Sequence, residues 1–316
     1  MKKILILGST GMLGNEVAKH FMPLKAFDTY LTYRNETVSF GTKENKFKFD
    51  VLCDDFNILP CDFDYVINCI GIIKPFMDDN LINSIYINAI FPRKLANWCS
   101  ENGMKLIHIT TDCAFSGLKG KYFESDAHDA LDAYGKSKSL GEPIEDAMVL
   151  RTSVIGEEIH KNASLISWAK SQKGNNVKGF TNHFWNGVTT NQYARCCEKI
   201  INENFYENGV FHIFAKDIVS KYQMLEYFNE VFELDLTINP YETMPGCDRS
   251  LSTVKDLCAK LEIPTVKEMV QELKKVDLSN IAKDKLNEML PNKIEDRHCC
   301  SGSMWIKRVK APNDND

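Results

Sequence analysis

Seven residues near the start of the chain, Gly8–Gly14, place the strongest constraint on its fold. They read Gly-Ser-Thr-Gly-Met-Leu-Gly, follow the short apolar run Lys3–Leu7 and open the helical pattern Met12–Phe21. In such a strand–turn–helix unit, one glycine makes the sharp turn, one lets the backbone approach a pyrophosphate, and one lets the helix pack closely on the sheet. The free N–H groups of the helix then face an anion. The segment predicts a dinucleotide site, with a tight turn that binds nothing as the alternative.

The same alternation of strand and helix continues through the first half of the chain. Asp64–Ile70 and Lys105–Ile109 are apolar runs typical of buried strands, whereas Leu81–Glu101 and Ala133–Glu142 have helical spacing. This order predicts an α/β fold, a Rossmann-like doubly wound parallel sheet with helices on both faces. We expect an NADP-binding domain over 1–155 to which 186–217 returns, a smaller α-rich substrate-binding portion over 156–290, and a tail over 291–316.

The residues after the second predicted strand favour NADPH over NADH. Thr29–Tyr33 is followed by Arg34, with no carboxylate before Glu36. An Asp or Glu at this place would accept a hydrogen bond from the ribose 2′-hydroxyl of NAD. Arg34 can instead pair with a 2′-phosphate, with a solvated loop arginine as the alternative. Asp50, after the third predicted strand, could accept from the adenine amino group or be an ordinary loop carboxylate.

Charge and cysteine content exclude several classes of protein. The 38 Lys and Arg against 43 Asp and Glu give a net charge of −5, which argues against a duplex nucleic-acid binder. The 11 cysteines are odd in number and irregularly spaced without Cys-x-x-Cys, as is typical of reduced cytoplasmic thiols. No histidine pair has metal-ligand spacing, and no stretch approaches the ~20 apolar residues of a membrane span. We therefore expect a cytoplasmic protein with no metal, membrane or nucleic-acid partner.

A tyrosine and a lysine on one predicted helix are the best candidates for acid–base chemistry. Tyr134 and Lys138 are four residues apart and so share one helical face. A neighbouring ammonium favours the phenolate and would bring the tyrosine pKa toward a useful range. The strand before this helix ends in Thr110-Thr111, and ligands in such sheets bind at the carboxyl ends of strands. Thr111 could therefore hydrogen-bond the reacting oxygen, whereas an exposed Tyr–Lys pair is the alternative.

Together these motifs resemble the extended short-chain dehydrogenases/reductases, and among them the dTDP-4-dehydrorhamnose reductase branch. The resemblance covers about residues 1–265 and is carried by Gly8–Gly14, Asn68–Gly71, Tyr86–Ala89, Thr110–Gly117, Tyr134–Lys138, Leu150–Ser153 and Asn186–Thr190. It implies that Thr111, Tyr134 and Lys138 are the catalytic residues. It also implies a cofactor bound by Gly8, Thr10, Gly11, Met12, Leu13, Gly14, Cys69, Ile70, Gly71 and Asn88, together with Tyr134 and Lys138.

By the same resemblance, the later α-rich part would hold a nucleotide-diphosphate sugar. The expected substrate contacts are Thr111, Asp112, Cys113, Trp185, Asn186 and Arg249. Arg249 could pair with the diphosphate. Trp185 could instead anchor the interface between the two parts, and Arg249 could instead form a surface salt bridge.

The resemblance also separates possible reactions. Dehydratases of this superfamily usually carry Thr-Asp-Glu, whereas here Asp112 is followed by Cys113, which disfavours dehydration. Epimerase–reductases place a thiol two residues after the catalytic hydroxyl; Cys113 has that offset, His183 could pair with it, and a small buried thiol is the alternative. We expect NADPH-dependent reduction of a nucleotide-diphospho-4-keto-6-deoxyhexose in deoxysugar biosynthesis. The rival is a non-catalytic regulatory subunit, because the methionine adenosyltransferase β-subunit resembles the same branch. A homodimer is an open expectation.

Overall fold

The computed structural model describes residues 1–35, 38–157 and 164–275, and Met1–Val276 forms one compact unit. The tail expected over 291–316 lies outside the described residues, as does the end of the portion expected over 156–290. No helix in the described part of the chain is long and apolar enough to cross a membrane.

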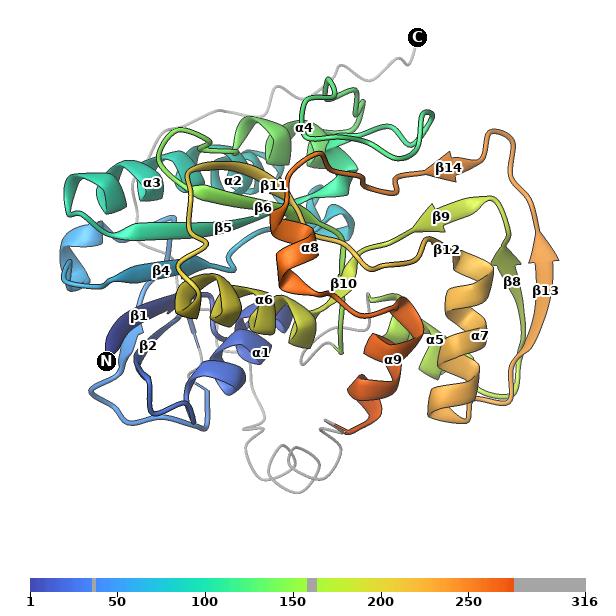
Figure 1. Ribbon diagram of the computed structural model, residues 1–316, viewed down its shortest axis with the longest axis horizontal. Helices are drawn as coiled ribbons and strands as arrows, with labels where there is room; N and C mark the ends of the chain where they lie inside the picture. Colours follow the sequence, from blue (N-terminus) through green and yellow to red (C-terminus); the bar gives the residue numbers. More distant parts are fainter. Residues whose placement is uncertain (36–37, 158–163, 276–316) are drawn as a thin grey trace, which may run out of the picture. The chain divides into compact units, whose positions relative to one another are not determined.

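The main sheet has seven parallel strands in the order β11-β6-β5-β4-β1-β2-β3 (Figure 1). This confirms the predicted doubly wound sheet. The strand order reverses between β1 and β4, and in such sheets ligands bind at this switch point, beyond the carboxyl ends of the strands. The last strand, β11, comes from late in the sequence and pairs with β6. The strands are β1 (Lys2–Leu7), β2 (Phe27–Tyr33), β3 (Lys46–Lys48), β4 (Tyr65–Asn68), β5 (Lys105–Thr111), β6 (Met148–Thr152) and β11 (Gly209–His212).

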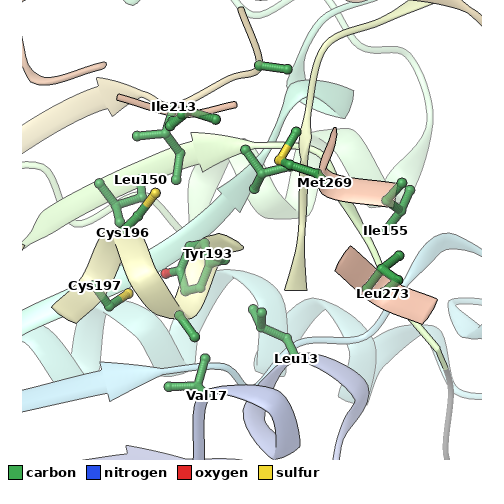
Figure 2. Close-up of a cluster of buried hydrophobic side chains, with 14 of the residues drawn as sticks. Leu13, Val17, Leu150, Ile155, Tyr193, Cys196, Cys197, Ile213, Met269 and Leu273 are labelled. Atoms are coloured by element: carbon green, nitrogen blue, oxygen red, sulfur yellow. The ribbon is translucent and has the colours of Figure 1, made fainter. Parts of the chain in front are cut away.

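Alternate side chains of each strand enter different cores, because successive residues of a strand point to opposite faces. Ile4 and Ile6 belong to the core beneath α1 (Met12–Phe21) and α6 (Thr190–Asn202), whereas Leu5 and Leu7 belong to the core beneath α3 (Phe91–Glu101). Figure 2 shows part of the first core, where Leu13 and Val17 of α1 lie near Tyr193 and Cys197 of α6. Helices on both faces thus bury the sheet and leave its carboxyl edge for a site.

The long predicted helix over Leu81–Glu101 is present but is not regular. It consists of α2 (Leu81–Ile85), a π-helical turn η3 (Tyr86–Ile90), and α3. Such turns often occur at functional sites. Here the π turn places Asn88, which is 1% exposed, inside the protein.

The smaller portion differs from the predicted α-rich composition. It contains helices α5 (Leu165–Ser171), α7 (Lys221–Phe232), α8 (Leu257–Leu261) and α9 (Val266–Lys275), but also short paired strands. These form three small sheets, β10-β7, β12-β9-β14 and β13-β8. Trp185 ends strand β9. The short strands are β7 (Val154–Ile155), β8 (Asn176–Phe180), β9 (His183–Trp185), β10 (Val188–Thr189), β12 (Val219–Ser220), β13 (Thr237–Tyr241) and β14 (Cys247–Asp248).

Candidate active site

The glycine turn has the geometry of an anion cradle. Gly8 has a φ of +81°, which side chains rarely tolerate, and a Cβ built on Gly14 would lie 2.1 Å from the Gly8 carbonyl oxygen. Gly11 caps α1 without a side-chain hydrogen bond, so the first amides of the helix, at Met12, Leu13 and Gly14, have no intrahelical acceptor. Thr10 lies in the turn just before that cap. These residues fit the diphosphate of a dinucleotide cofactor.

Arg34 and Asp50 follow neighbouring strands of the sheet but differ in their freedom. Arg34 is exposed directly after β2 and forms no ion pair with a described residue. The Asp50 carboxylate accepts the Leu52 N–H at 3.1 Å and so holds its own turn. Arg34 is thus available to a phosphate, whereas one oxygen of Asp50 is already engaged.

Asn88 fastens the loop after β4. Its Oδ1 accepts the Ile72 N–H at 2.8 Å, and its Nδ2 donates to the Ile72 carbonyl at 2.9 Å. Its Nδ2 also donates to the Ser137 hydroxyl at 3.3 Å, which ties the loop to α4 (Ala133–Leu140). Cys69, Ile70 and Gly71 lie in this loop, between β4 and the residue that Asn88 holds. The structure therefore gives Asn88 the task of positioning the loop expected to contact a cofactor.

The structure brings Thr111, Tyr134 and Lys138 to one end of β5. Thr111 ends the strand, and its hydroxyl accepts the Cys113 N–H at 3.1 Å. The same hydroxyl lies close enough to Tyr134 to lower the pKa of its phenol. Lys138, 5% exposed, donates from Nζ to the Ile109 carbonyl of the same strand at 3.0 Å. A Cβ built on Gly71 would lie 3.8 Å from this Nζ, so the ammonium also faces the loop after β4.

The electrostatics of Tyr134 differ from those that the Tyr-x-x-x-Lys spacing predicts. Burial raises the pKa of the phenol, and the neighbouring Cys113 and Asp112 raise it further, while the Thr111 hydroxyl lowers it in part. Burial also lowers the pKa of Lys138 to about 8. Desolvation therefore dominates the pKa of Tyr134, which is a protonated phenol at neutral pH in the protein without ligand.

Cys113 and His183 do not form the thiol–histidine pair considered for an epimerase. Burial, and after it Asp112, raise the pKa of the Cys113 thiol to about 12. His183 instead hydrogen-bonds the Thr243 hydroxyl at 2.6 Å and stacks on Phe180. No hydrogen bond joins the two side chains in the described part of the chain. The geometry therefore gives no support to proton abstraction by this thiol.

The expected substrate residues have unequal freedom. Asn186 is buried and exchanges two hydrogen bonds with the Leu251 backbone, at 2.8 and 2.9 Å, so it fastens two segments. Trp185 is 3% exposed, and its indole N–H has no partner among the described residues. Arg249 donates from Nε to the Phe115 carbonyl at 2.8 Å, which leaves the rest of its guanidinium near Asp112. Trp185 and Arg249 remain candidates for substrate contacts, whereas the side-chain amide of Asn186 is already hydrogen-bonded to the protein backbone.

Lys221 is a site residue that the sequence reasoning missed. It is the first residue of α7, and its Nζ lies 5.5 Å from the centroid of the Trp185 ring. Its charge acts on Asp112 and Cys113, which are more than one hundred residues earlier in the chain. The sequence contained one indication of this role. A cation in the first turn of a helix is unfavourable beside the helix dipole, so a lysine directly after the Ser220 cap does not stabilise the helix and indicates another role.

A buried polar network anchors the far end of α4. Arg151, 1% exposed, donates to both carboxylate oxygens of Glu142, at 3.1 and 2.7 Å. It also donates to Nε2 of His128 at 2.7 Å and to Nε2 of His212 at 2.8 Å. A guanidinium has no acceptor, so both imidazoles must accept with an unprotonated Nε2 and are neutral. Burial lowers the pKa of His212 to about 4, in agreement with this geometry.

A doubly wound parallel sheet with an anion cradle after β1, and with a hydroxyl, a phenol and an ammonium at its carboxyl edge, defines the extended short-chain dehydrogenase/reductase fold. Residues 1–248 match the family of the RmlD substrate binding domain, and the chain belongs to this family.

Two relatives of similar sequence identity have different functions by name. The chain is 27% identical to methionine adenosyltransferase 2 subunit beta of Danio rerio over 279 residues, 83% of this chain and 84% of that protein. It is 26% identical to dTDP-4-dehydrorhamnose reductase of Aggregatibacter actinomycetemcomitans over 249 residues, 70% of this chain and 76% of that protein. The family is therefore established, and similar sequence identities point to an enzyme and to a subunit.

Solved structures share the fold. A dTDP-4-dehydrorhamnose reductase from Clostridium acetobutylicum has a TM-score of 0.66 at 24% identity, covering 87% of this chain and 99% of that one. The Bacillus anthracis dTDP-4-dehydrorhamnose reductase, in complex with NADP, has a TM-score of 0.68 at 17% identity and covers 88% of this chain and 100% of that one. Structural relatives thus bind a nicotinamide dinucleotide.

Proposed function

We propose that the protein is an NADPH-dependent reductase of the 4-keto group of a nucleotide-diphospho-4-keto-6-deoxyhexose, acting in deoxysugar precursor biosynthesis. One observation carries the proposal: the Lys138 ammonium is hydrogen-bonded to β5 two residues before Thr111, and the Thr111 hydroxyl lies close to the Tyr134 phenol, so all three groups lie at the same end of β5. The anion cradle follows β1, two strands away in the same sheet. A reduction needs this set, whereas a dehydration needs a further acid and base.

The state of Tyr134 suits the direction of reduction. Its raised pKa keeps the phenolic proton in place at neutral pH, so the group is ready to donate to a carbonyl oxygen that gains negative charge. Thr111 lies close enough to Tyr134 to act on its pKa, and its hydroxyl would orient the same oxygen. Lys138 stabilises the phenolate that remains after the proton has left. A nicotinamide bound at this site would supply the hydride.

The cofactor would be held by this chain's backbone at one end and by Lys138 at the other. The amides of the first turn of α1 would receive the diphosphate, and Lys138 would reach the hydroxyls of the nicotinamide ribose. Arg34, exposed after β2, would pair with the 2′-phosphate and so favour NADPH. Arg249 would bind the diphosphate of the sugar nucleotide.

The proposal is tested by single-turnover NADPH oxidation with a panel of nucleotide-linked 4-keto-6-deoxyhexoses. Tyr134→Phe removes only the hydroxyl, and we expect turnover to fall by about 10²–10⁴-fold, the usual contribution of general acid catalysis. Tyr241→Phe, on the exposed strand β13, is the matched control and should leave turnover unchanged. Turnover of Tyr134→Phe close to that of the wild type would refute the assignment.

The second candidate is a regulatory subunit of another enzyme. The observation that favours it is the similarity to methionine adenosyltransferase 2 subunit beta over 83% of the chain. Under this reading the wild-type protein would bind NADPH yet oxidise it with no sugar of the panel. It would also co-elute with a methionine adenosyltransferase catalytic chain in gel filtration.

A further inference from the structure

Two cations converge on the turn that follows the catalytic threonine. Lys221 comes from the first turn of α7, and Arg249 follows β14, so the sequence separates both from the turn Asp112–Cys113. Both cations act on the Asp112 carboxylate. Strand β9 brings the two cations together, because it pairs with β12, just before Lys221, on one side and with β14, just before Arg249, on the other.

No carboxylate of the described residues forms a close ion pair with either cation, although Asp112 interacts with both over a longer distance. Within the described residues, neither Lys221 nor Arg249 has an Asp or Glu oxygen within 4.0 Å, the distance that defines the ion pairs found elsewhere in the chain. Asp112 accepts from the Thr111 hydroxyl at 3.2 Å. Asp129 accepts from the Ser116 amide and hydroxyl, both at 2.6 Å, and Asp132 pairs with a lysine of its own.

Trp185 holds the free ammonium in place. The Nζ of Lys221 lies over its ring at 5.5 Å from the centroid, a cation–π contact. The indole N–H of the same tryptophan, 3% exposed, has no partner in the described part of the chain. A buried donor without an acceptor is costly, and this donor belongs to the ring that Lys221 contacts.

We propose that Lys221 and Arg249 form a two-cation subsite that selects a diphosphate over a monophosphate. This inference rests on the proposed function, because it assigns the diphosphate of the sugar nucleotide to this place. Arg249 alone provides one fork of donors, and Lys221 adds a second positive charge on the opposite flank of β9. Lys221 is then a specificity-determining residue that binds substrate and takes no part in proton transfer.

The test measures binding and not turnover, so that it stands apart from the reductase assignment. Isothermal titration of the NADP⁺-loaded protein compares dTDP and UDP with dTMP and UMP. We expect Lys221→Gln to weaken the binding of the diphosphates by about 10- to 100-fold, the loss typical for a charged hydrogen-bond partner. The substitution should also reduce the preference of the protein for diphosphates over monophosphates. Lys221→Arg keeps the charge and should retain most of the preference.

Lys216→Gln is the matched control, since Lys216 is an exposed lysine five residues before Lys221. It should leave all four affinities unchanged. A Lys221→Gln protein that keeps the wild-type preference for diphosphates would overturn the inference, and so would a wild-type protein without such a preference.

A further arm distinguishes the diphosphate from an acid group on the sugar. Binding of UDP-glucose and UDP-glucuronate is compared in the wild type and in Lys221→Gln. Equal weakening of both supports the diphosphate, whereas weakening of UDP-glucuronate alone would show that Lys221 faces the sugar carboxylate and would overturn the assignment. If the wild-type protein reduces no sugar of the panel but Lys221→Gln weakens the binding of dTDP, the proposed function is refuted and this inference stands.

Discussion

Lys138 should make the stability of the protein without ligand rise with pH in alkaline solution. The side chain is 5% exposed and donates to the Ile109 carbonyl at 3.0 Å. Burial lowers its pKa from 10.5 to about 8. Glu142 raises it only in part, because both oxygens of that carboxylate are held by Arg151.

The sign and size of the effect follow from proton linkage. Between pH 8 and 10.5 the unfolded chain still holds a proton on Lys138 that the folded protein has released, so folding becomes more favourable as pH rises. The stabilisation is complete above pH 10.5 and is lost as pH falls through about 8, below which the lysine is charged in both states. A pKa that falls from 10.5 to about 8 corresponds to about 3 kcal/mol of unfolding free energy.

Urea unfolding from pH 7 to 10.5, followed by circular dichroism, measures this contribution. Lys138→Met removes the titrating group, so its stability should fall relative to the wild type by about 3 kcal/mol as pH rises across this range. Lys136→Met, an exposed lysine on the same helix, should follow the wild-type curve. Parallel curves for the wild type and Lys138→Met would show that the ammonium is not desolvated, and the reasoning would fail.

Two further predictions concern the acid range and the cofactor. Burial lowers the pKa of His212 from 6.5 to about 4, so the stability it contributes is complete above pH 6.5 and is lost as pH falls toward 4, by about 3 kcal/mol. His212→Gln keeps an acceptor for Arg151 and should flatten that part of the unfolding curve, whereas an unchanged slope would contradict the neutral imidazole. In fluorescence titrations, Arg34→Ala should weaken the binding of NADPH by about 1–3 kcal/mol and leave the binding of NADH nearly unchanged. An equal loss for both cofactors would argue against a phosphate contact.

The local features of the site could be predicted from the sequence because each depends on residues close together in the chain. The helix Met12–Phe21 begins and ends where its pattern predicts, and the turn at Gly8–Gly14 is marked by glycines of its own, although Thr32 also hydrogen-bonds its backbone. The separation of four residues between Tyr134 and Lys138 fixes their common face within one helix.

Features that depend on distant contacts could not be predicted in the same way. Strand β13 exists because it pairs with β8, about sixty residues earlier, and neither segment has a strong strand pattern of its own. Asn186 fastens the Leu251 backbone, a task that its place in a family motif does not suggest. The pKa of Tyr134 rises because the fold buries the phenol beside Asp112 and Cys113, and burial is a property of the whole fold.

The environment of Lys138 bears on the choice between an enzyme and a binding subunit. Arg151 engages the nearest carboxylate, Glu142, so the ammonium is left facing the loop at Gly71 with one backbone carbonyl as its acceptor. Such an arrangement destabilises the folded protein at neutral pH, and apolar packing in its place would not. A subunit that binds NADPH would also use this charge to reach cofactor hydroxyls. Only an enzyme that leaves a phenolate at Tyr134 has a second use for it, and this second use is the argument for the reductase.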